Sequence, residues 1–257
     1  MRELFEEGFQ PSPLDPDASV RESTRGPQRK RFYKHADVAE GADGFALVLD
    51  GRAVKTPGRR SLVAPVRALA ETMAAEWNAQ GELLDPLAMP MTRLGNSVVD
   101  GVTDRVAAVA DDLAGYFGSD LLFYRASHPE SLVARQAEHW DPVLDWARDT
   151  LGAHFMLAEG VMHVRQPDAA LAAARAALPD DPWRIAALHL VTTITGSALL
   201  ALALMRRVRD PAQAWTAANV DEDWNFDTWG RDEEALRRRA SAERDFLTAA
   251  EVLRVLG

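Results

Sequence analysis

Cysteine is absent from the 257 residues of this chain, and the common catalytic signatures are absent with it. Without cysteine there are no disulfides, no thiolate nucleophiles and no cysteine-ligated zinc or iron–sulfur sites. The nucleotide loops GxxxxGK[ST] and GxGxxG do not occur, nor does the serine-hydrolase elbow GxSxG. The six histidines include no HxxxH pair, so a helical zinc site has no local support. These absences favour binding over catalysis, and we expect no cofactor, metal or nucleotide.

Basic residues are in the minority: 29 Lys and Arg stand against 39 Asp and Glu, a formal net charge of −10. Because phosphate binding needs a basic face, this balance argues against nucleic acid as the partner and permits a basic protein surface instead. The composition, 47% hydrophobic and 26% charged, is typical of a globular protein. The length suits one large domain or two small ones.

Long hydrophobic runs are scarce as well. The first residues, MRELFEEG, are acidic and have no apolar core, so we expect neither a secretory signal nor a transit peptide. Residues 185–205 contain no charged side chain and are long enough to cross a bilayer. Several polar residues dilute their hydrophobicity, among them His189 and Gly196. We therefore predict a buried core helix with a hydrogen-bonded His189, and no membrane insertion.

The sequence divides into three parts. Residues 1–30 are rich in proline and polar residues and predict an extended arm. Residues 31–92 predict a small β-rich domain with one helix, which opens at Pro65 and ends at Gly81. Its expected strands form an antiparallel sheet, in which Asp50-Gly51 turns the central hairpin. These strands are residues 31–34, 45–49, 52–55 and 61–64.

Residues 93–257 predict a mainly α-helical domain. Asp100 or Thr103 is expected to cap a helix that runs to Phe117. Further helices are expected to begin at proline or aspartate positions, namely near residues 129, 168, 182, 211 and 232. Alternating apolar residues in 151–165 predict a short strand pair. The expected fold class is therefore α+β, with a small N-terminal antiparallel β domain followed by a larger, mainly α-helical domain.

Residues 219–230, NVDEDWNFDTWG, place four acids beside two tryptophans and a phenylalanine. A segment of this kind usually caps a helix or faces a partner. We expect its rings to anchor the segment inward and some of its carboxylates to remain outside. Replacing Glu222 and Asp223 by Lys is then expected to weaken partner capture while leaving the melting temperature nearly unchanged.

The residues of this segment also suit two other interpretations. Asp221-x-Asp223-x-Asn225 resembles the start of an EF-hand, but Phe226 occupies the position that needs glycine, which disfavours calcium. Acids beside tryptophans also suit a carbohydrate-active hydrolase, because tryptophan stacks on sugar rings and two carboxylates supply the acid and the base or nucleophile. That second interpretation stays open as the alternative function.

Six segments, taken in order, resemble the F1-ATPase assembly chaperones that hold the unassembled alpha subunit. They are RFYK (31–34), LDGRAVKTP (49–57), AEWNAQ (75–80), PMTRL (90–94), DLLFY (120–124) and residues 217–230. The resemblance runs from about residue 31 to the C-terminus. It implies a small β domain followed by a helical domain, no catalysis, and a chaperone that covers the alpha-subunit surface otherwise used to meet the beta subunit.

The resemblance also implies a partner, a compartment and a set of binding residues. The partner is the F1-ATPase alpha subunit, and the free protein is expected to be a monomer. Relatives act in mitochondria and in some bacteria, and the lack of a presequence points to a bacterial cytoplasm. Masking an exposed subunit interface needs apolar anchors with enough polar character for later release. The residues expected to bind the partner are Asp221, Glu222, Asp223, Trp224, Asp227, Trp229, and, in a soft apolar loop, Met89, Met91 and Arg93.

Overall fold

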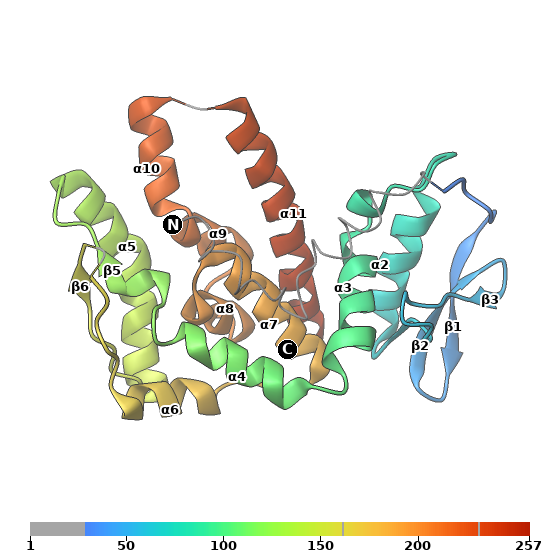
Figure 1. The fold of residues 1–257 in the computed structure, drawn as a ribbon, viewed down its shortest axis with the longest axis horizontal. Coiled ribbons are helices and arrows are strands. Elements are labelled where there is room, and N and C mark those ends of the chain that lie inside the picture. The colour runs from blue at the N-terminus through green and yellow to red at the C-terminus, as the bar shows by residue number, and fades with distance from the viewer. Residues whose placement is uncertain (1–28, 161, 231) are drawn as a thin grey trace, which may run out of the picture. The chain divides into compact units, whose positions relative to one another are not determined.

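The computed structural model describes residues 29–160, 162–230 and 232–257, which fall into two compact units (Figure 1). The first unit ends at Asp104 and the second runs from Arg105 to Gly257. The first holds an antiparallel sheet and the second is mainly helical, so the expected α+β class is confirmed. The sequence analysis placed the division after residue 92, whereas the first compact unit continues to Asp104. Of the expected arm, residues 1–28 lie outside the described part of the chain.

The described residues of the first unit form a four-stranded sheet centred on β2 (Gly44–Leu49). β2 pairs in antiparallel fashion with β1 (Ala36–Gly41), β3 (Arg52–Ala53) and β4 (Val63–Ala64). Asp50 and Gly51 connect β2 to β3 with φ angles of 47° and 80°. Two positive φ angles are what a two-residue hairpin turn requires, and glycine adopts them without strain. The predicted hairpin is confirmed, with a shorter return strand.

Two helices, not the single one expected, accompany this sheet. α2 (Arg67–Asn78) packs against β1 and β2 and buries Leu69, Ala70, Met73 and Ala74, so the helix that the sequence predicted after Pro65 is confirmed. The 3-10 turn η1 (Pro86–Ala88) leads into α3 (Pro90–Ser97), which continues as the π-helical turn η2 (Val98–Val102). Figure 1 shows α2 between the sheet and α3. Because α3 packs on α2, the unit extends beyond residue 92.

Two side chains of α2 join it to its neighbours. The Glu76 carboxylate accepts hydrogen bonds from the backbone N–H groups of Met91 (2.6 Å) and Thr92 (2.8 Å), so it caps α3 from the adjacent helix. The Asn78 amide pairs with both backbone groups of Ala36, at 2.8 Å each. These residues belong to the AEWNAQ segment of the family resemblance, and they fix the sheet and α3 to one helix.

Asp100 does not cap the following helix, and that expectation is wrong. Its carboxylate instead accepts hydrogen bonds from the Thr56 hydroxyl (2.6 Å) and the Gly58 N–H (2.7 Å) in the loop after β3. The Thr103 hydroxyl donates to the Val98 carbonyl at 2.9 Å. α4 (Val106–Tyr116) therefore begins without a side-chain cap.

Residues 31–34 are not a strand, which corrects another expectation. The Arg31 N–H donates to the Glu82 carbonyl at 2.8 Å, so this segment runs beside the connection that follows α2. The Tyr33 hydroxyl donates to the Trp77 carbonyl at 2.6 Å, and the two ring centroids lie 5.4 Å apart. The RFYK segment thus holds the C-terminal end of α2, and Trp77 packs on Tyr33.

The second unit surrounds a pair of buried helices, α7 (Pro182–Thr195) and α8 (Ala198–Met205). Every residue of α8 is buried, and α11 (Glu233–Leu256) and α4 both pack on α7. The remaining elements are η3 (Leu121–Phe123), β5 (Tyr124–Arg125), α5 (Glu130–Trp146), η4 (Ala147–Leu151), β6 (Ala158–Glu159), α6 (Asp168–Ala176), α9 (Pro211–Ala218) and α10 (Val220–Trp229).

The apolar stretch at residues 185–205 is two helices, because Gly196 ends α7 with a φ of 71°. The described helices include none with the length and hydrophobicity of a membrane span. His189 is buried with its Nε2 atom 2.7 Å from the Asp112 carboxylate, so the expected hydrogen-bonded core histidine is confirmed. The strand pair expected within 151–165 is wrong, since β6 pairs in parallel with β5.

Asp120 is fully buried and anchors the start of α8. Its two carboxylate oxygens accept hydrogen bonds from the N–H groups of Leu122 (3.1 Å) and Leu199 (3.0 Å). The second of these bonds joins residues that are 79 positions apart. Burial raises the pKa of Asp120 to about 6, and the hydrogen bonds oppose that rise. The first N–H groups of a helix lack intrahelical acceptors, which explains why a carboxylate is held at the start of α8.

Replacing Asp120 with Ala is expected to lower the free energy of unfolding by about 2–4 kcal/mol, because two buried N–H groups lose their acceptors. Asp85→Ala is the matched control, since Asp85 accepts a single exposed bond from the Leu87 N–H, and it is expected to cost under about 1 kcal/mol. The folded pKa of Asp120 lies above its unfolded value. Its titration therefore adds stability at low pH that is lost as pH rises through about 6. Urea unfolding at pH 5 and 7 should show the larger wild-type advantage at pH 5, and equal costs for both variants would contradict this role.

Candidate functional site

The acidic and aromatic segment is a helix of its own, α10, and not the end of the helix before it. α9 ends at Ala218, and α10 starts at Val220 with Asn219 between them. Asp221, Glu222 and Asp223 fall in its first turn, where negative charge interacts favourably with the helix dipole. Gly230, with a φ of 91°, ends it. The four acids are therefore spread around one helix whose neighbours decide what each one meets.

Arg239 of α11 holds the first turn of α10. Its guanidinium donates to Asp223 at 2.5 Å and to Glu222 at 3.3 Å. It also lies 5.7 Å from the ring centroid of Phe226 and 5.9 Å from that of Trp215, within cation–π range. The hydrogen bond to Asp223 is the main reason that the pKa of Arg239 is raised. One cation therefore meets two carboxylates and two rings.

The other two acids of α10 face α5. The Asp221 carboxylate accepts from the Gln136 side-chain amide at 2.7 Å, and the buried Gln136 in turn accepts from the Ala126 N–H at 2.8 Å. The Asp227 carboxylate pairs with Arg135 at 3.0 Å. α10 is thus fixed on one side by α5 and on the other by α11, through polar contacts in both cases.

Some carboxylates of α10 are exposed, as expected: the side chains of Asp227 and Glu222 are 58% and 43% exposed. Glu222 and Asp223 are nevertheless not free, because Arg239 pairs with both. Lysine at these positions would oppose Arg239, so the double replacement is expected to destabilise α10 and not to leave the melting temperature unchanged. The rings do not all pack inward either: Trp224 is half-buried, and Trp229 is 81% exposed.

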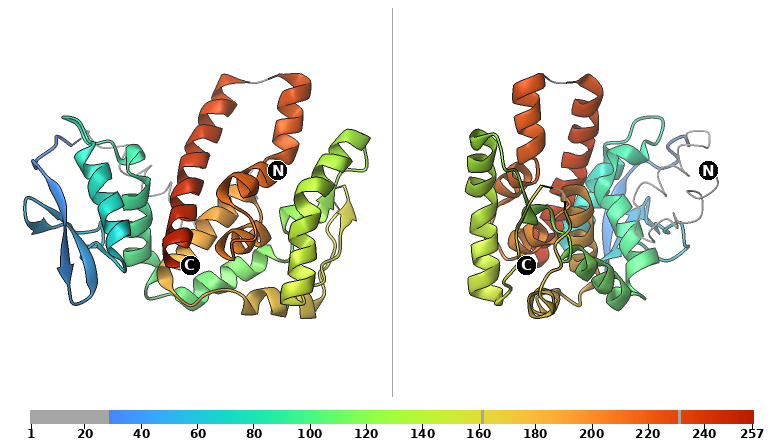
Figure 2. Two further views of the ribbon diagram at one scale, coloured as in Figure 1. Left: turned by 180° about the vertical axis from the view of Figure 1, so that it is seen from behind. Right: turned by 60° about the vertical axis from the view of Figure 1, so that its left-hand side comes forward.

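Trp229 lies where α10 and α11 project from the body of the second unit. Figures 1 and 2 show α10 and the first half of α11 rising together in every view, with the start of α5 on the other side of α10. Leu236, near the start of α11, is 39% exposed, and Val133 of α5 is 36% exposed. We call Asp227, Trp229 and Leu236 the α10–α11 edge. It combines the exposed indole of Trp229 with the aliphatic side chain of Leu236 and the carboxylate of Asp227, which pairs with Arg135 but stays partly exposed.

The methionine loop does not provide a second surface. Met89 and Met91 are buried in the first unit, at 5% and 1% exposure, because Pro90 starts α3 and turns both side chains into the core. Arg93 is half-buried. Burial raises the pKa of Glu76, and the Arg93 charge is one of the smaller effects that oppose this rise. The soft apolar loop expected at these three residues is therefore a helix start that packs on α2.

The geometry of α10 does not suit a hydrolase. Its carboxylates come from one helix, and each is bonded to an arginine or to Gln136. A glycosidase needs two carboxylates that face each other across a substrate cleft. Among the residues that the structure describes, no group of three or more His, Asp or Glu side chains is placed to hold a metal ion. α10 is a helix that polar contacts fix to α5 and α11, and its C-terminal end at Trp229 is exposed.

The residues that hold α10 were missed by sequence reasoning. Arg239 stands in the run LRRRA, in which three adjacent arginines look alike in the sequence. Only their partners in the folded protein distinguish them. Arg237 and Arg238 pair with Glu233 and Glu234 on their own helix, whereas Arg239 reaches across to α10. Helical spacing predicts the first two pairs, at i and i+4, but not the third.

Comparison with known proteins agrees with this architecture. A family model described as ATP12 chaperone protein matches residues 30–148. The crystal structure of the Atu1473 protein of Agrobacterium tumefaciens, described as a chaperone candidate, is 47% identical with a TM-score of 0.85, over 95% of this chain and 94% of that one. Atp12 from Paracoccus denitrificans is 39% identical with a TM-score of 0.80, over 88% of this chain and 97% of that one. An aspartate-to-lysine mutant of the same protein gives the same values.

The fold and these likenesses define a chaperone. The chain belongs to the ATP12 chaperone family, and the resemblance to F1-ATPase assembly chaperones that its sequence showed is confirmed. The two bacterial structures cover 95% and 88% of this chain, and the likeness therefore extends well beyond residues 30–148, the part that the family model matches.

Replacing Arg239 with Ala is expected to loosen α10, because its first turn loses its link to α11. Backbone amides of α10 should exchange with deuterium roughly tenfold faster or more, since a partly buried charged pair contributes about 1–2 kcal/mol. Arg237→Ala is the matched control, because the Arg237 side chain is 79% exposed and pairs only within α11. Equal exchange in both variants would show that Arg239 does not hold the helix.

Proposed function

We propose that this protein binds the unassembled alpha subunit of F1-ATPase and masks the surface through which that subunit meets the beta subunit. Family membership supports a role in F1 assembly. The proposal assigns the α10–α11 edge as the docking surface and places the protein in a bacterial cytoplasm as a monomer when free. It assigns no catalysis and no cofactor.

The exposed Trp229 is the observation that carries this proposal. Tryptophan offers a large apolar area, and an indole that is 81% exposed leaves most of that area in water. Tryptophan is also enriched among the few residues that dominate binding energy at protein interfaces. Leu236 extends the apolar area onto α11, and the partly exposed Asp227 lies two residues before Trp229. A small apolar anchor with a charged border suits an interaction that must later be released.

The negative charge of this protein supports a basic surface on its client, the alpha subunit. The chain carries a net charge of −10, and Asp227 and Glu222 keep side-chain exposures of 58% and 43% although each is paired. A client arginine or lysine beside them would meet negative charge without having to break the Asp223–Arg239 contact. Such charges mainly raise the rate of encounter and select the partner, and their effect weakens as salt is added.

Trp229→Ser is expected to weaken capture of the isolated alpha subunit about tenfold or more while leaving the fold unchanged. An exposed position contributes within about 0.5 kcal/mol to the free energy of unfolding. Met162→Ser is the matched control, since Met162 is 77% exposed and lies outside α10 and α11. The measurement is the dissociation constant of each variant with purified alpha subunit, together with its melting temperature.

Two outcomes distinguish an error in the docking surface from an error in the partner. If Trp229→Ser binds the alpha subunit like the wild type, the α10–α11 edge is not the docking surface. If the wild-type protein does not bind the alpha subunit at all, the proposed client is wrong.

A further inference from the structure

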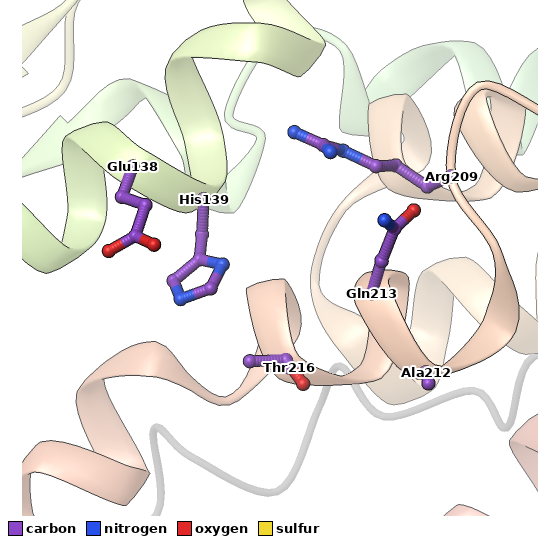
Figure 3. A pocket seen from close by; sticks show the side chains of 6 residues that line it. All are labelled: Glu138, His139, Arg209, Ala212, Gln213 and Thr216. Atoms are coloured by element: carbon purple, nitrogen blue, oxygen red, sulfur yellow. The ribbon is translucent and has the colours of Figure 1, made fainter.

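A pocket lined by several polar side chains lies between α5 and α9 in the second unit, and none of its lining residues belongs to the α10–α11 edge (Figure 3). Its volume is about 360 Å³, within the range of roughly 300–1,000 Å³ that is usual for small-ligand sites. The lining residues come from α5, from α9 and from the turn before α9; they are Glu138, His139, Arg209, Ala212, Gln213 and Thr216.

Local structure explains why Arg209 and Gln213 line this space. Arg209 lies in the turn between α8 and α9, and its N–H donates to the Ala203 carbonyl at 3.3 Å. Gln213 is the third residue of α9 and forms a capping box with Asp210, in which its side-chain oxygen accepts from the Asp210 N–H at 3.1 Å. Only the oxygen of that amide is used, so its NH₂ group stays available. Figure 3 shows the Gln213 amide and the Arg209 side chain next to each other.

The pocket contains more hydrogen-bond donors than the protein uses. Within the described part of the chain, no side-chain hydrogen bond or ion pair reaches Arg209, His139 or Thr216, and the buried Nε of Arg209 has no acceptor. A buried donor without an acceptor costs stability, so each such group calls for an explanation. Arg209 carries five N–H donors and a permanent charge, in the fork geometry that matches a carboxylate.

We propose that this pocket binds the carboxylate of an acidic residue in a polypeptide. Arg209 holds the carboxylate through paired N–H bonds, and the Gln213 amide and Thr216 hydroxyl donate to it from α9. Glu138 lies on the far side of His139 from Arg209 (Figure 3), where its carboxylate suits a backbone N–H of the same peptide. The lining holds one cation, Arg209, and one anion, Glu138, so a bound carboxylate adds a single uncompensated negative charge. A doubly charged phosphate would add two, at a greater cost.

This site does not depend on the proposed client. The α10–α11 edge presents acids and an indole, which suit basic and apolar groups, whereas the α5–α9 pocket presents donors, which suit an acid. The two surfaces therefore recognise opposite chemistry, and each is tested without the other.

The test uses NMR of the full-length protein, with the Arg side-chain Nε–H signals as the readout. Four ligands are titrated separately into the protein. They are N-acetyl-Gly-Glu-Gly-amide, its neutral analogue N-acetyl-Gly-Gln-Gly-amide, sodium acetate and inorganic phosphate. We expect the Glu peptide to shift the Arg209 Nε–H signal saturably and the Gln peptide to leave it in place. Acetate and phosphate should bind at least tenfold more weakly, because neither presents a backbone N–H to Glu138.

Arg209→Gln is the test variant and Arg206→Gln is its control. Arg209 makes no side-chain bond in the described structure, so its replacement should not lower the melting temperature, while it should weaken binding of the Glu peptide tenfold or more. Arg206 is exposed in the same turn and outside the pocket, so its replacement should leave peptide binding as it is. The absence of a saturable shift at Arg209 overturns the proposal. Equal binding of the Gln peptide, of acetate or of phosphate overturns it as well, as does unchanged affinity in Arg209→Gln.

Discussion

The contact between Arg239 and the first turn of α10 is the interaction on which the candidate site depends. α10 packs on α5, and the described contacts that tie it to α11 are the bonds from Arg239 to Glu222 and Asp223 and its position over Phe226. Because these acids are drawn toward α11, they serve first to place the helix. What α10 then presents to solvent is its C-terminal end, where Trp229 lies open. A surface rich in acids is therefore organised by a cation.

Much of the fold followed from local sequence, because the signals that predict it are local. The hairpin at Asp50-Gly51, the helix after Pro65 and the start of α11 near residue 232 depend on neighbouring residues, and all three are confirmed. The errors concern distant contacts. Asp100 meets Thr56 and not the helix after it, and the strand pair expected within 151–165 forms instead between β5 and β6.

The candidate site was predicted in composition but not in arrangement. Residues 221–229 stood out by their acids and rings, yet which acids are paired depends on Arg135 and Arg239, which lie far from them along the chain. The exposure of Trp229 likewise depends on where α11 begins. The buried Met89 and Met91 show the reverse case: a soft apolar loop in the sequence becomes the start of α3, and its methionines join the core. Pockets such as the one beside Arg209 gave no sequence signal.

Site-specific photo-crosslinking tests whether the α10–α11 edge meets the alpha subunit. A photoreactive amino acid is placed at position 229 in one protein and at position 162 in another. Both positions are exposed, at 81% and 77%, so neither replacement should disturb the fold. If the edge is the docking surface, purified alpha subunit crosslinks to position 229 and not to position 162. Equal crosslinking from both positions, or from position 162 alone, would show that the docking surface lies elsewhere.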